Sequence, residues 1–438
     1  MTNSYHLGVD VGASRVHAAT ARYTSSRNER VEPCVLSTTG DDMSASMWVS
    51  REGDLEFGAI ASAWAREQPE AIVGDLRRRI GTGIPFLVAG HRVFAEEAYA
   101  QLVAWVVGAV TEIEGVPPVG VVLTHPVHWG AHRREGVRQA VEEHCRVPVD
   151  LTPEAEAAAW GAVDEAQAGE LWATCDLGHT SLATAIVRRH EDGWTVLPEA
   201  FGTAPLGGLD VDDALVGSLL SDRATARSPV RAPSAELRSA SVAAKEALST
   251  DTDAVLALQF TPGPSTVRLT RDEFESLIGE LLDQTVCAVR QTLTDGGVTA
   301  EDLSGVVLAG GSARIPLVTE RLSTALGVSA LAEPDPGAVV AMGAARMALR
   351  KSTGDLAAEP DSGSSRDEPL RPNDQVAALI PFIPPERARL ATYAWRLVVA
   401  SLIVVCAVYL AWAFTSDSVG VFGLGGHADS VVEPPRGG

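Results

Sequence analysis

The chain has 438 residues, of which 46% are apolar and 21% are charged, and these fractions exclude a wholly disordered or collagen-like protein. Its 57 Asp and Glu residues exceed its 35 Lys and Arg residues, which gives a net charge of −22. A chain this acidic lacks the basic surface that binds phosphate backbones, so we expect no nucleic-acid partner. Five widely spaced cysteines without a C-x-x-C pair indicate free thiols rather than disulfides or zinc ligands.

Four apolar runs recur along the chain, and each ends in a turn that is polar or rich in glycine. They span 7–12, 121–126, 172–178 and 306–312, with helices predicted after the second and the fourth, over 131–144 and 315–326. The first and third runs continue into alternating apolar segments, as the second strand of a hairpin does. Strands that alternate with helices predict an α/β layered architecture.

Two of these turns carry the pattern Asp-x-Gly, at Asp10 and at Asp176. Glycine allows successive backbone amides to approach an anion closely, and an ionised Asp suits Mg²⁺, which prefers oxygen ligands. A single Asp-x-Gly pattern is weak evidence of a nucleotide site. Two such turns that face each other would clamp a triphosphate and its metal between two lobes. The residues themselves therefore favour a nucleotide site.

Residues 5–348 resemble the nucleotide-binding domain of the DnaK-type heat-shock 70 chaperones, in the actin and hexokinase superfamily. The motifs that carry the resemblance occur in the family's order: LGVDVGASRV, PEAEAAAWG, CDLGHTSLATAIV, PLGGLDVDDALV, LRSASVAAKEALS and VVLAGGSARIPLV. The resemblance implies a two-lobed, actin-like (ribonuclease-H-like) ATPase fold over residues 1–350. It also implies ATP or ADP as ligand, with Mg²⁺.

The resemblance assigns expected roles to residues that match the family's motifs. Asp10 and Asp176 would hold Mg²⁺ through its waters, and Glu154 would orient the attacking water. Ser181 takes the place of a threonine hydroxyl near the γ-phosphate. The positions expected to surround the nucleotide are Gly12, Ala13, Ser14, Gly178, His179, Gly207, Gly208, Lys245, Gly310, Gly311, Ser312, Arg314 and Asp335.

The chain departs from the family pattern at several of these places. A gapless overlay of residues 58–81 puts Ser62 at the family's essential lysine near the γ-phosphate, although Arg66 or Arg77 could reach the site. The arginine run 77–79 is expected to be a solvated helix face, with a phosphate contact as the alternative. Further departures are Ala13 for a threonine, His179 and Thr180 for two glycines, Ala183 for an aspartate, Val242 for a glutamate and Glu246 for an arginine. They predict weak ATP hydrolysis at best.

The C-terminal part of the chain has a different composition. Residues 351–394 are rich in Pro, Ser, Asp and Glu, which is typical of a disordered linker. Residues 397–414 carry no charge, and together with Trp395 they predict a transmembrane helix over 395–414. Basic residues lie before this helix, so we expect the N-terminal domain in the cytoplasm and the short tail 415–438 outside.

No peptide-binding domain follows the predicted nucleotide-binding domain, so we expect no groove for peptide clients. The favoured hypothesis is a single-pass protein of the cell membrane that acts as a nucleotide-dependent switch for unidentified protein partners. The alternative is a pseudo-ATPase scaffold without nucleotide turnover. A third hypothesis, a sugar or small-molecule kinase of the same superfamily, fits the adenosine motif less well.

Overall fold

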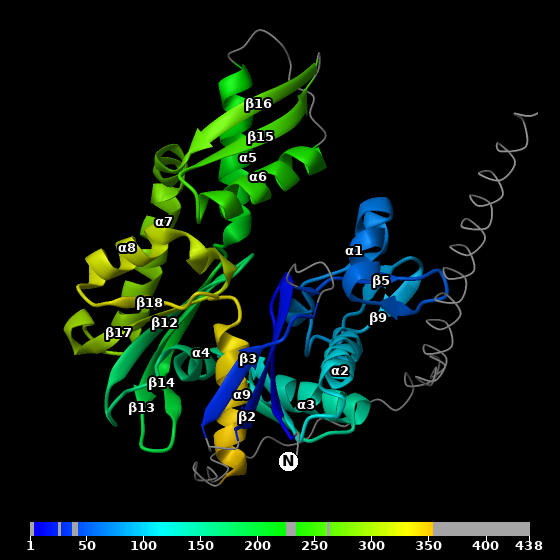
Figure 1. Ribbon diagram of the computed structural model, residues 1–438, viewed down its shortest axis with the longest axis vertical. Coiled ribbons are helices and arrows are strands. Elements are labelled where there is room, and N and C mark those ends of the chain that lie inside the picture. Colours follow the sequence, from blue (N-terminus) through cyan, green and yellow to red (C-terminus); the bar gives the residue numbers. More distant parts are fainter. Residues whose placement is uncertain (1–3, 25–27, 37–42, 225–233, 261–262, 354–438) are drawn as a thin grey trace, which may run out of the picture. The chain divides into compact units, whose positions relative to one another are not determined.

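Two sheets of the same topology organise the part of the chain that the structure, a computed structural model, describes: residues 4–24, 28–36, 43–224, 234–260 and 263–353 (Figure 1). The order in the first sheet is β11 (Val149–Pro153), β10 (Val121–His125), β1 (His6–Val11), β2 (Arg15–Tyr23) and β3 (Glu29–Pro33), with β4 (Met43–Ser44) on β2. The order in the second sheet is β18 (Ala330–Ala332), β17 (Leu303–Ala309), β12 (Leu171–Leu177), β13 (Leu182–Arg189) and β14 (Trp194–Ala204).

The strand directions match as well as the order. β1 runs antiparallel to β2 and parallel to β10, and β12 runs antiparallel to β13 and parallel to β17. All five residues of β10 are buried, as expected of a strand with parallel neighbours on both sides and helices on its faces. The resulting mixed α/β architecture, with two mixed sheets, is consistent with the lobes of an actin-like ATPase.

Two helices lie between the sheets and hold them together. α9 (Val339–Ser352) packs on β1, β2, β3 and β10, whereas α4 (Glu154–Ala162) packs on β12, β13 and β14, and the two helices pack on each other. Their close approach depends on glycine, because a Cβ at Gly343 would lie 1.8 Å from the Ala157 carbonyl oxygen. A Cβ at Gly161 would lie 2.1 Å from the Val339 carbonyl oxygen.

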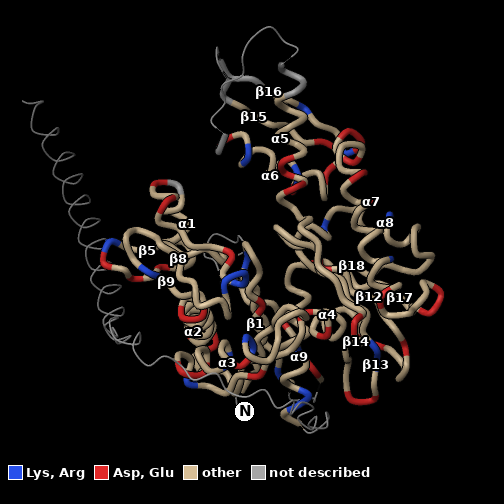
Figure 2. The backbone as a smooth tube through the Cα atoms, turned by 180° about the vertical axis from the view of Figure 1, so that it is seen from behind, with Lys and Arg blue, Asp and Glu red and all other residues tan. Residues whose placement is uncertain are grey.

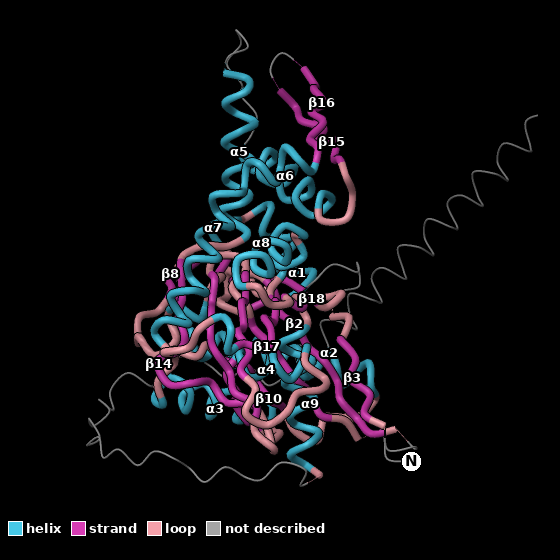
Figure 3. Tube along the Cα trace, turned by 90° about the vertical axis from the view of Figure 1, so that its left-hand side faces the viewer, coloured by secondary structure: helices cyan, strands magenta, loops and turns pink. Residues whose placement is uncertain are grey.

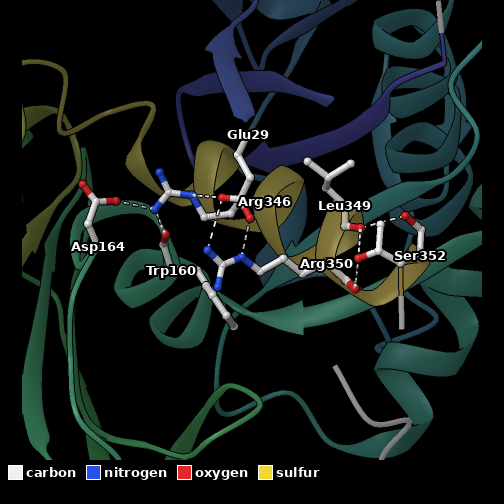
Figure 4. A network of polar contacts seen from close by, with 8 residues as sticks. Glu29, Trp160, Asp164, Arg346, Leu349, Arg350 and Ser352 are labelled. Carbon is white, nitrogen blue, oxygen red and sulfur yellow. Dashed lines mark hydrogen bonds and ion pairs between the residues drawn. The ribbon is translucent and has the colours of Figure 1, made fainter. Parts of the chain in front are cut away.

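Each of the two sheets, with the helices packed on it, forms one half of the fold. Polar contacts at one end of α9 also join the two halves (Figure 4). The Arg350 guanidinium pairs with Glu29 of β3 at 2.6 Å and lies over the Trp160 ring of α4, 5.0 Å from its centroid. Arg346 donates to the Trp160 carbonyl oxygen at 2.7 Å and pairs with Asp164 at 2.9 Å. These contacts fix the ends of α4 and α9 against the first sheet.

The remaining helices cover the outer faces of the sheets or extend beyond them. Their bounds are α1 (Gly58–Glu67), α2 (Ala95–Glu114), α3 (Ala131–Cys145), α5 (Gly208–Ala224), α6 (Ser234–Leu248), α7 (Arg271–Asp295) and α8 (Pro316–Leu326), with short 3₁₀ turns η1 (Pro69–Ala71), η2 (Leu76–Arg78), η3 (Ala300–Asp302) and η4 (Gly311–Arg314). The helices predicted over 131–144 and 315–326 are confirmed as α3 and α8. α7 begins at a capping box in which Thr270 and Glu273 satisfy each other's backbone amides.

Small hairpins and short strands complete the described part. They are β5 (Met47–Val49), β6 (Leu55–Glu56), β7 (Ile72–Val73), β8 (Phe86–Val88) and β9 (His91–Val93) beside the first sheet, and β15 (Asp253–Phe260) with β16 (Gly263–Thr270). Figure 3 shows the β15–β16 hairpin with α5 and α6 at one end, beyond the second sheet. Acidic residues are spread over both halves of the fold (Figure 2).

The last described helix, α9, ends at Ser352, two residues beyond the predicted end of the domain at residue 350. The predicted transmembrane helix, the external tail and nearly all of the predicted linker lie outside the described residues. Among the helices of the described residues, none combines the length and apolar character that a bilayer-spanning segment requires.

Candidate functional site

A cavity of about 1250 Å³ is lined by the turns of both main hairpins and by residues of η2, α4, α5, α6, η4 and α8. This volume is large enough for a nucleoside triphosphate. The predicted site residues that line it are Asp10, Gly12, Ala13, Ser14, Glu154, Asp176, Gly178, His179, Ser181, Gly208, Lys245, Gly310, Gly311, Ser312 and Arg314. The two others, Gly207 and Asp335, lie just behind the lining and contact residues that belong to it.

The two hairpin turns have the same backbone geometry. The Gly12 amide donates to the Arg15 carbonyl oxygen at 2.8 Å, and the Gly178 amide donates to the Ser181 carbonyl oxygen at 3.0 Å. In each turn the glycine lies two residues after the aspartate. The two carboxylates therefore lie at equivalent ends of β1 and β12. The two Asp-x-Gly patterns of the sequence therefore form two turns of the same backbone geometry.

Glycines let other segments approach these turns. Gly310 has a φ of +83°, and a Cβ there would lie 2.4 Å from Asp176 Oδ1. A Cβ at Gly208 would lie 2.7 Å from Ser312 Oγ, and one at Gly207 would lie 2.5 Å from the His179 carbonyl oxygen. Glycine at these three positions therefore lets the neighbouring segments approach closely, as a nest of amides around an anion requires.

Asp10 and Asp176 supply the oxygen ligands that Mg²⁺ prefers. The Thr124 hydroxyl donates to Asp10 Oδ1, which fixes that carboxylate at the end of β1. Burial and then the negative charge of Asp10 raise the pKa of Asp176 to about 6. Two half-buried carboxylates that repel each other are a donor set that fits a divalent cation, since the cation removes their mutual repulsion.

Arg77 places a fixed positive charge beside these carboxylates. Its Nη1 lies 2.5 Å from Oε1 of Glu154, the first residue of α4, and the two side chains are only 19% and 10% exposed. Burial raises the pKa of Glu154 to about 8, although Arg77 acts in the opposite direction. Burial alone would lower the pKa of Arg77, but the carboxylates of Glu154, Asp10 and Asp176 raise it.

The structure places a cation in the cavity at Arg77, one of the two arginines that the sequence left open for this position. Ser62 is exposed on α1 and is absent from the cavity lining, whereas Arg77 lies in that lining. Asp75, in the left-handed region with a φ of +49°, begins the short η2 turn that directs Arg77 inward.

The prediction that the arginine run 77–79 forms one solvated helix face is wrong. The three residues belong to a 3₁₀ turn and its end, and they point to different surroundings. Arg78 pairs with Asp75 at 2.7 Å, and the Arg79 guanidinium lies 4.3 Å from the centroid of the Phe86 ring. The sequence leaves Arg77 open as a cation for the site, and the structure places Arg77 in the cavity lining.

Lys245 connects α6 to the first residues of α5. Its Nζ lies 2.8 Å from Oδ1 of Asp212, which is 1% exposed, and donates to the Gly208 carbonyl oxygen at 3.3 Å. His179 lines the cavity nearby, and burial followed by the charge of Lys245 lowers its pKa. The histidine that replaces a family glycine is therefore neutral at pH 7 and narrows the turn without adding charge.

The far wall of the cavity is built by η4 and the start of α8. Ser312 Oγ donates to the Gly178 carbonyl oxygen at 3.2 Å, and Arg314 pairs with Asp335 at 2.5 Å. Across from this wall, Glu246 of α6 lies 4.0 Å from Arg15 of β2, an ion pair between the two halves of the fold. The predicted nucleotide-side residues thus converge on one cavity.

Comparisons with known proteins agree with this geometry. The family model described as Hsp70 protein matches residues 77–354. The chain is 30% identical over 364 residues to the chaperone protein HscA of Pectobacterium carotovorum subsp. carotovorum strain PC1, and 29% identical over 363 residues to that of Serratia proteamaculans strain 568. Each alignment covers 77% of this chain but only 57% of the relative. The chain therefore spans little more than half the length of these relatives.

Proposed function

Because the chain belongs to the Hsp70 family, as an HscA-like ATPase homologue, we propose that it is a nucleotide-dependent switch anchored in the cell membrane. Nucleotide binding would change the angle between the two halves, and proteins at the cytoplasmic face of the membrane would respond to that change. Domains of this family bind ATP or ADP with Mg²⁺. The observation that carries the proposal is the convergence of Asp10, Asp176, Glu154 and Arg77 on one cavity between the duplicated hairpin turns.

Each group has a role in this proposal. Asp10 and Asp176 would hold Mg²⁺, which neutralises phosphate charge when it is bound. Arg77 is a fixed cation in a buried site, where it would stabilise the negative charge that develops on the transferred phosphoryl group. Glu154, oriented by Arg77, would accept a hydrogen bond from the attacking water. The amides of the Gly12 and Gly178 turns would bind the phosphate oxygens.

Slow turnover suits a switch. His179 and Thr180 replace two glycines in the second turn, which leaves less room for a phosphate, and both residues line the cavity. The same observation favours the alternative, a pseudo-ATPase scaffold that binds partners without hydrolysis. The membrane part of the proposal is supported by the uncharged stretch 397–414, the Trp residues near its ends and the basic residues before it.

Thermal unfolding of the full-length chain with and without Mg²⁺-ATP tests the nucleotide site. A ligand at 100 times its dissociation constant stabilises the folded state by about 2.7 kcal/mol, and the unfolding temperature rises accordingly. Single-turnover hydrolysis would then separate the two candidates, with Glu154→Gln as the variant expected to bind nucleotide without cleaving it. Binding without any turnover in the unmodified chain would favour the scaffold, and no thermal shift at millimolar nucleotide would refute the nucleotide-dependent switch and leave the scaffold.

The orientation in the membrane has a separate test. Cys287 is an exposed free thiol on α7, whereas Cys175 is buried. A membrane-impermeant maleimide should label Cys287 in inside-out vesicles and leave it unlabelled in sealed right-side-out vesicles. Cys287→Ser is the control that identifies the labelled site. Labelling from the outside, or recovery of the chain away from membranes, would contradict the proposed location.

A further inference from the structure

Three arginines line the part of the cavity that η2 and the start of α3 form. They are Arg77 and Arg78 of η2 and Arg133 of α3, and we call them the arginine corner. The chain as a whole has a net charge of −22, so three cations at one edge of a cavity are contrary to its overall composition. Clefts lined by charges of one sign concentrate ions of the opposite sign. The arginine corner is therefore a place to look for an anion.

The guanidinium groups of the corner lie near one another. The Arg133 side chain crosses the backbone at Gly81, three residues after Arg78, because a Cβ at Gly81 would lie 2.5 Å from Arg133 Cγ and 3.1 Å from its Nε. Burial, and then the charges of Arg133 and Arg77, lower the pKa of His128, which also lines the cavity. Both guanidinium groups are thus close enough to one imidazole to act on it.

The arginine corner has fewer acidic partners than cations. Arg77 pairs with Glu154 at 2.5 Å, and Arg78 pairs with Asp75 through its Nε at 2.7 Å. A guanidinium has five N–H donors, so each pair leaves donors for a ligand. Arg133 is half-buried, and within the described ranges it has no hydrogen-bond or ion-pair partner. The third positive charge is therefore not balanced by a bound carboxylate of the described residues.

The fold holds Arg133 in this position. Trp129, in the turn just before α3, is buried and stacks on the His125 ring at 6.3 Å between centroids, which fixes the start of the helix. Arg133 lies in the first turn of α3, and that turn contains no acidic residue. A positive side chain there is opposed by the helix dipole, and an anion bound beside it removes the conflict. Glu96, which accepts from the Gly81 amide at 2.5 Å, lies outside the cavity lining.

We propose that the arginine corner is a second anion site, which binds inorganic phosphate at the edge of the nucleotide cavity. The planar guanidinium fork matches phosphate oxygens, and arginines from η2 and α3 can hold one phosphate from two sides. The phosphate comes from solution or from hydrolysis in the adjacent site, and the second source rests on the proposed function. Product held there would prolong the state that follows hydrolysis, which suits a slow switch.

The test is equilibrium dialysis of the full-length chain against radiolabelled phosphate at constant ionic strength, with saturating Mg²⁺-ADP and without it. ADP occupies the phosphate turns, so label that binds in its presence reports a second anion site. The unmodified chain should bind phosphate under both conditions. Arg133→Gln should raise the dissociation constant for phosphate roughly tenfold and leave that for ADP unchanged, because a charge-assisted pair is lost.

Two further variants make the test specific. Arg134→Gln removes the same charge from the next residue of α3, which is exposed and absent from the cavity lining. It should change the dissociation constant for phosphate by less than about twofold, since salt screens an exposed charge. Arg78→Gln, on a different element, should weaken phosphate binding as Arg133→Gln does, and it keeps the test decisive if Arg133→Gln does not fold.

The possible results separate this inference from the proposed function. Equal phosphate binding by the unmodified chain, Arg133→Gln and Arg78→Gln would overturn the inference, as would no phosphate binding or displacement of the label by ADP, and the nucleotide site would stand. Phosphate binding that Arg133→Gln weakens, without any binding of ADP, would support the anion site and refute the nucleotide switch.

Single-turnover kinetics identify the source of the phosphate. If the site holds the product of hydrolysis, release of phosphate measured with a fluorescent phosphate sensor should lag behind cleavage measured by acid quench. Arg133→Gln should shorten the lag without changing the cleavage rate. Release without a lag, in a chain that binds phosphate in dialysis, would identify phosphate from solution as the ligand.

Discussion

Arg77 Nη1 lies 2.5 Å from Glu154 Oε1, and this pair joins the short η2 turn of the first half to the first residue of α4. The contact brings together residues that are 77 positions apart in the sequence. It places a permanent cation beside the two carboxylates expected to hold magnesium. The pair gives the proposed hydrolytic site its positive charge without the lysine that the family uses.

Replacing Arg77 with Ala should lower the single-turnover rate of ATP hydrolysis by on the order of 100-fold, because a preorganised charge on the transferred group is lost. Arg77→Lys should retain most of the rate, and Ser62→Lys should leave it unchanged, since Ser62 is exposed outside the cavity. Rapid-quench assays of the full-length chain measure these rates. A gain of activity in Ser62→Lys would restore Ser62 to the site and contradict the role of Arg77.

Asp10→Asn and Asp176→Asn should each abolish Mg²⁺-dependent nucleotide binding, because a neutral amide is a much weaker ligand for a hard cation. Titration calorimetry with ADP, in the presence of Mg²⁺ and then of EDTA, measures the dependence. Asp150→Asn, at an exposed position on β11, is the control and should bind as the unmodified chain does. Retained metal dependence in both site variants would place the cation elsewhere.

Gly343→Ala should destabilise the fold strongly, by several kcal/mol, because the new methyl group would lie 1.8 Å from the Ala157 carbonyl oxygen and push α9 away from α4. Gly136→Ala on α3 is the matched control. A Cβ at Gly136 meets no atom within 4 Å, so this change should raise the free energy of unfolding by up to about 1 kcal/mol through helix propensity. Urea unfolding of both variants measures the difference. Equal stabilities would mean that α4 and α9 are not packed so closely.

The buried His125 should make the fold less stable in mild acid. Burial lowers the pKa of His125 to about 4, whereas an unfolded histidine titrates near 6.5. As pH falls from 7 to 5 the unfolded chain binds a proton that the folded chain does not, which costs about 2 kcal/mol of stability. Below pH 4 both states are protonated and the penalty is complete.

The raised pKa values of Glu154 and Asp176 oppose this effect, because those folded carboxyls bind protons before the unfolded ones. The comparison is therefore made with His125→Phe, which keeps a ring beside Trp129 and cannot titrate. Urea unfolding at pH 7 and pH 5 should show a loss in the unmodified chain that exceeds the loss in the variant by about 2 kcal/mol. Parallel losses would show that His125 is not buried in its neutral form.

Much of the fold and of the site could be predicted from the sequence because the signals are local. The apolar runs that end in Asp10 and Asp176 became β1 and β12, and Gly12 and Gly178 close the turns that follow. Fifteen of the seventeen predicted site residues line the same cavity. A strand that ends in a glycine turn specifies its own geometry, and the order of such motifs then indicates the architecture.

Other features depended on contacts between distant segments. Asp212 is 1% exposed, and its partner Lys245 reaches it from α6, 33 positions further along the chain. The position of Arg77 depends on a left-handed Asp75 and on Glu154 across the cavity, so neighbouring arginines with the same local sequence differ completely in environment.

The sequence by itself determined the strands, the glycine turns and the carboxylates at their ends, because each follows from a few consecutive residues. Only the tertiary structure decided which cation lies beside those carboxylates. That question concerns side chains from separate elements, whose distances are set by the packing of α4 and α9 between the sheets. Local propensity contains no information about such distances, and the cavity has its charge pattern only after the two halves are assembled.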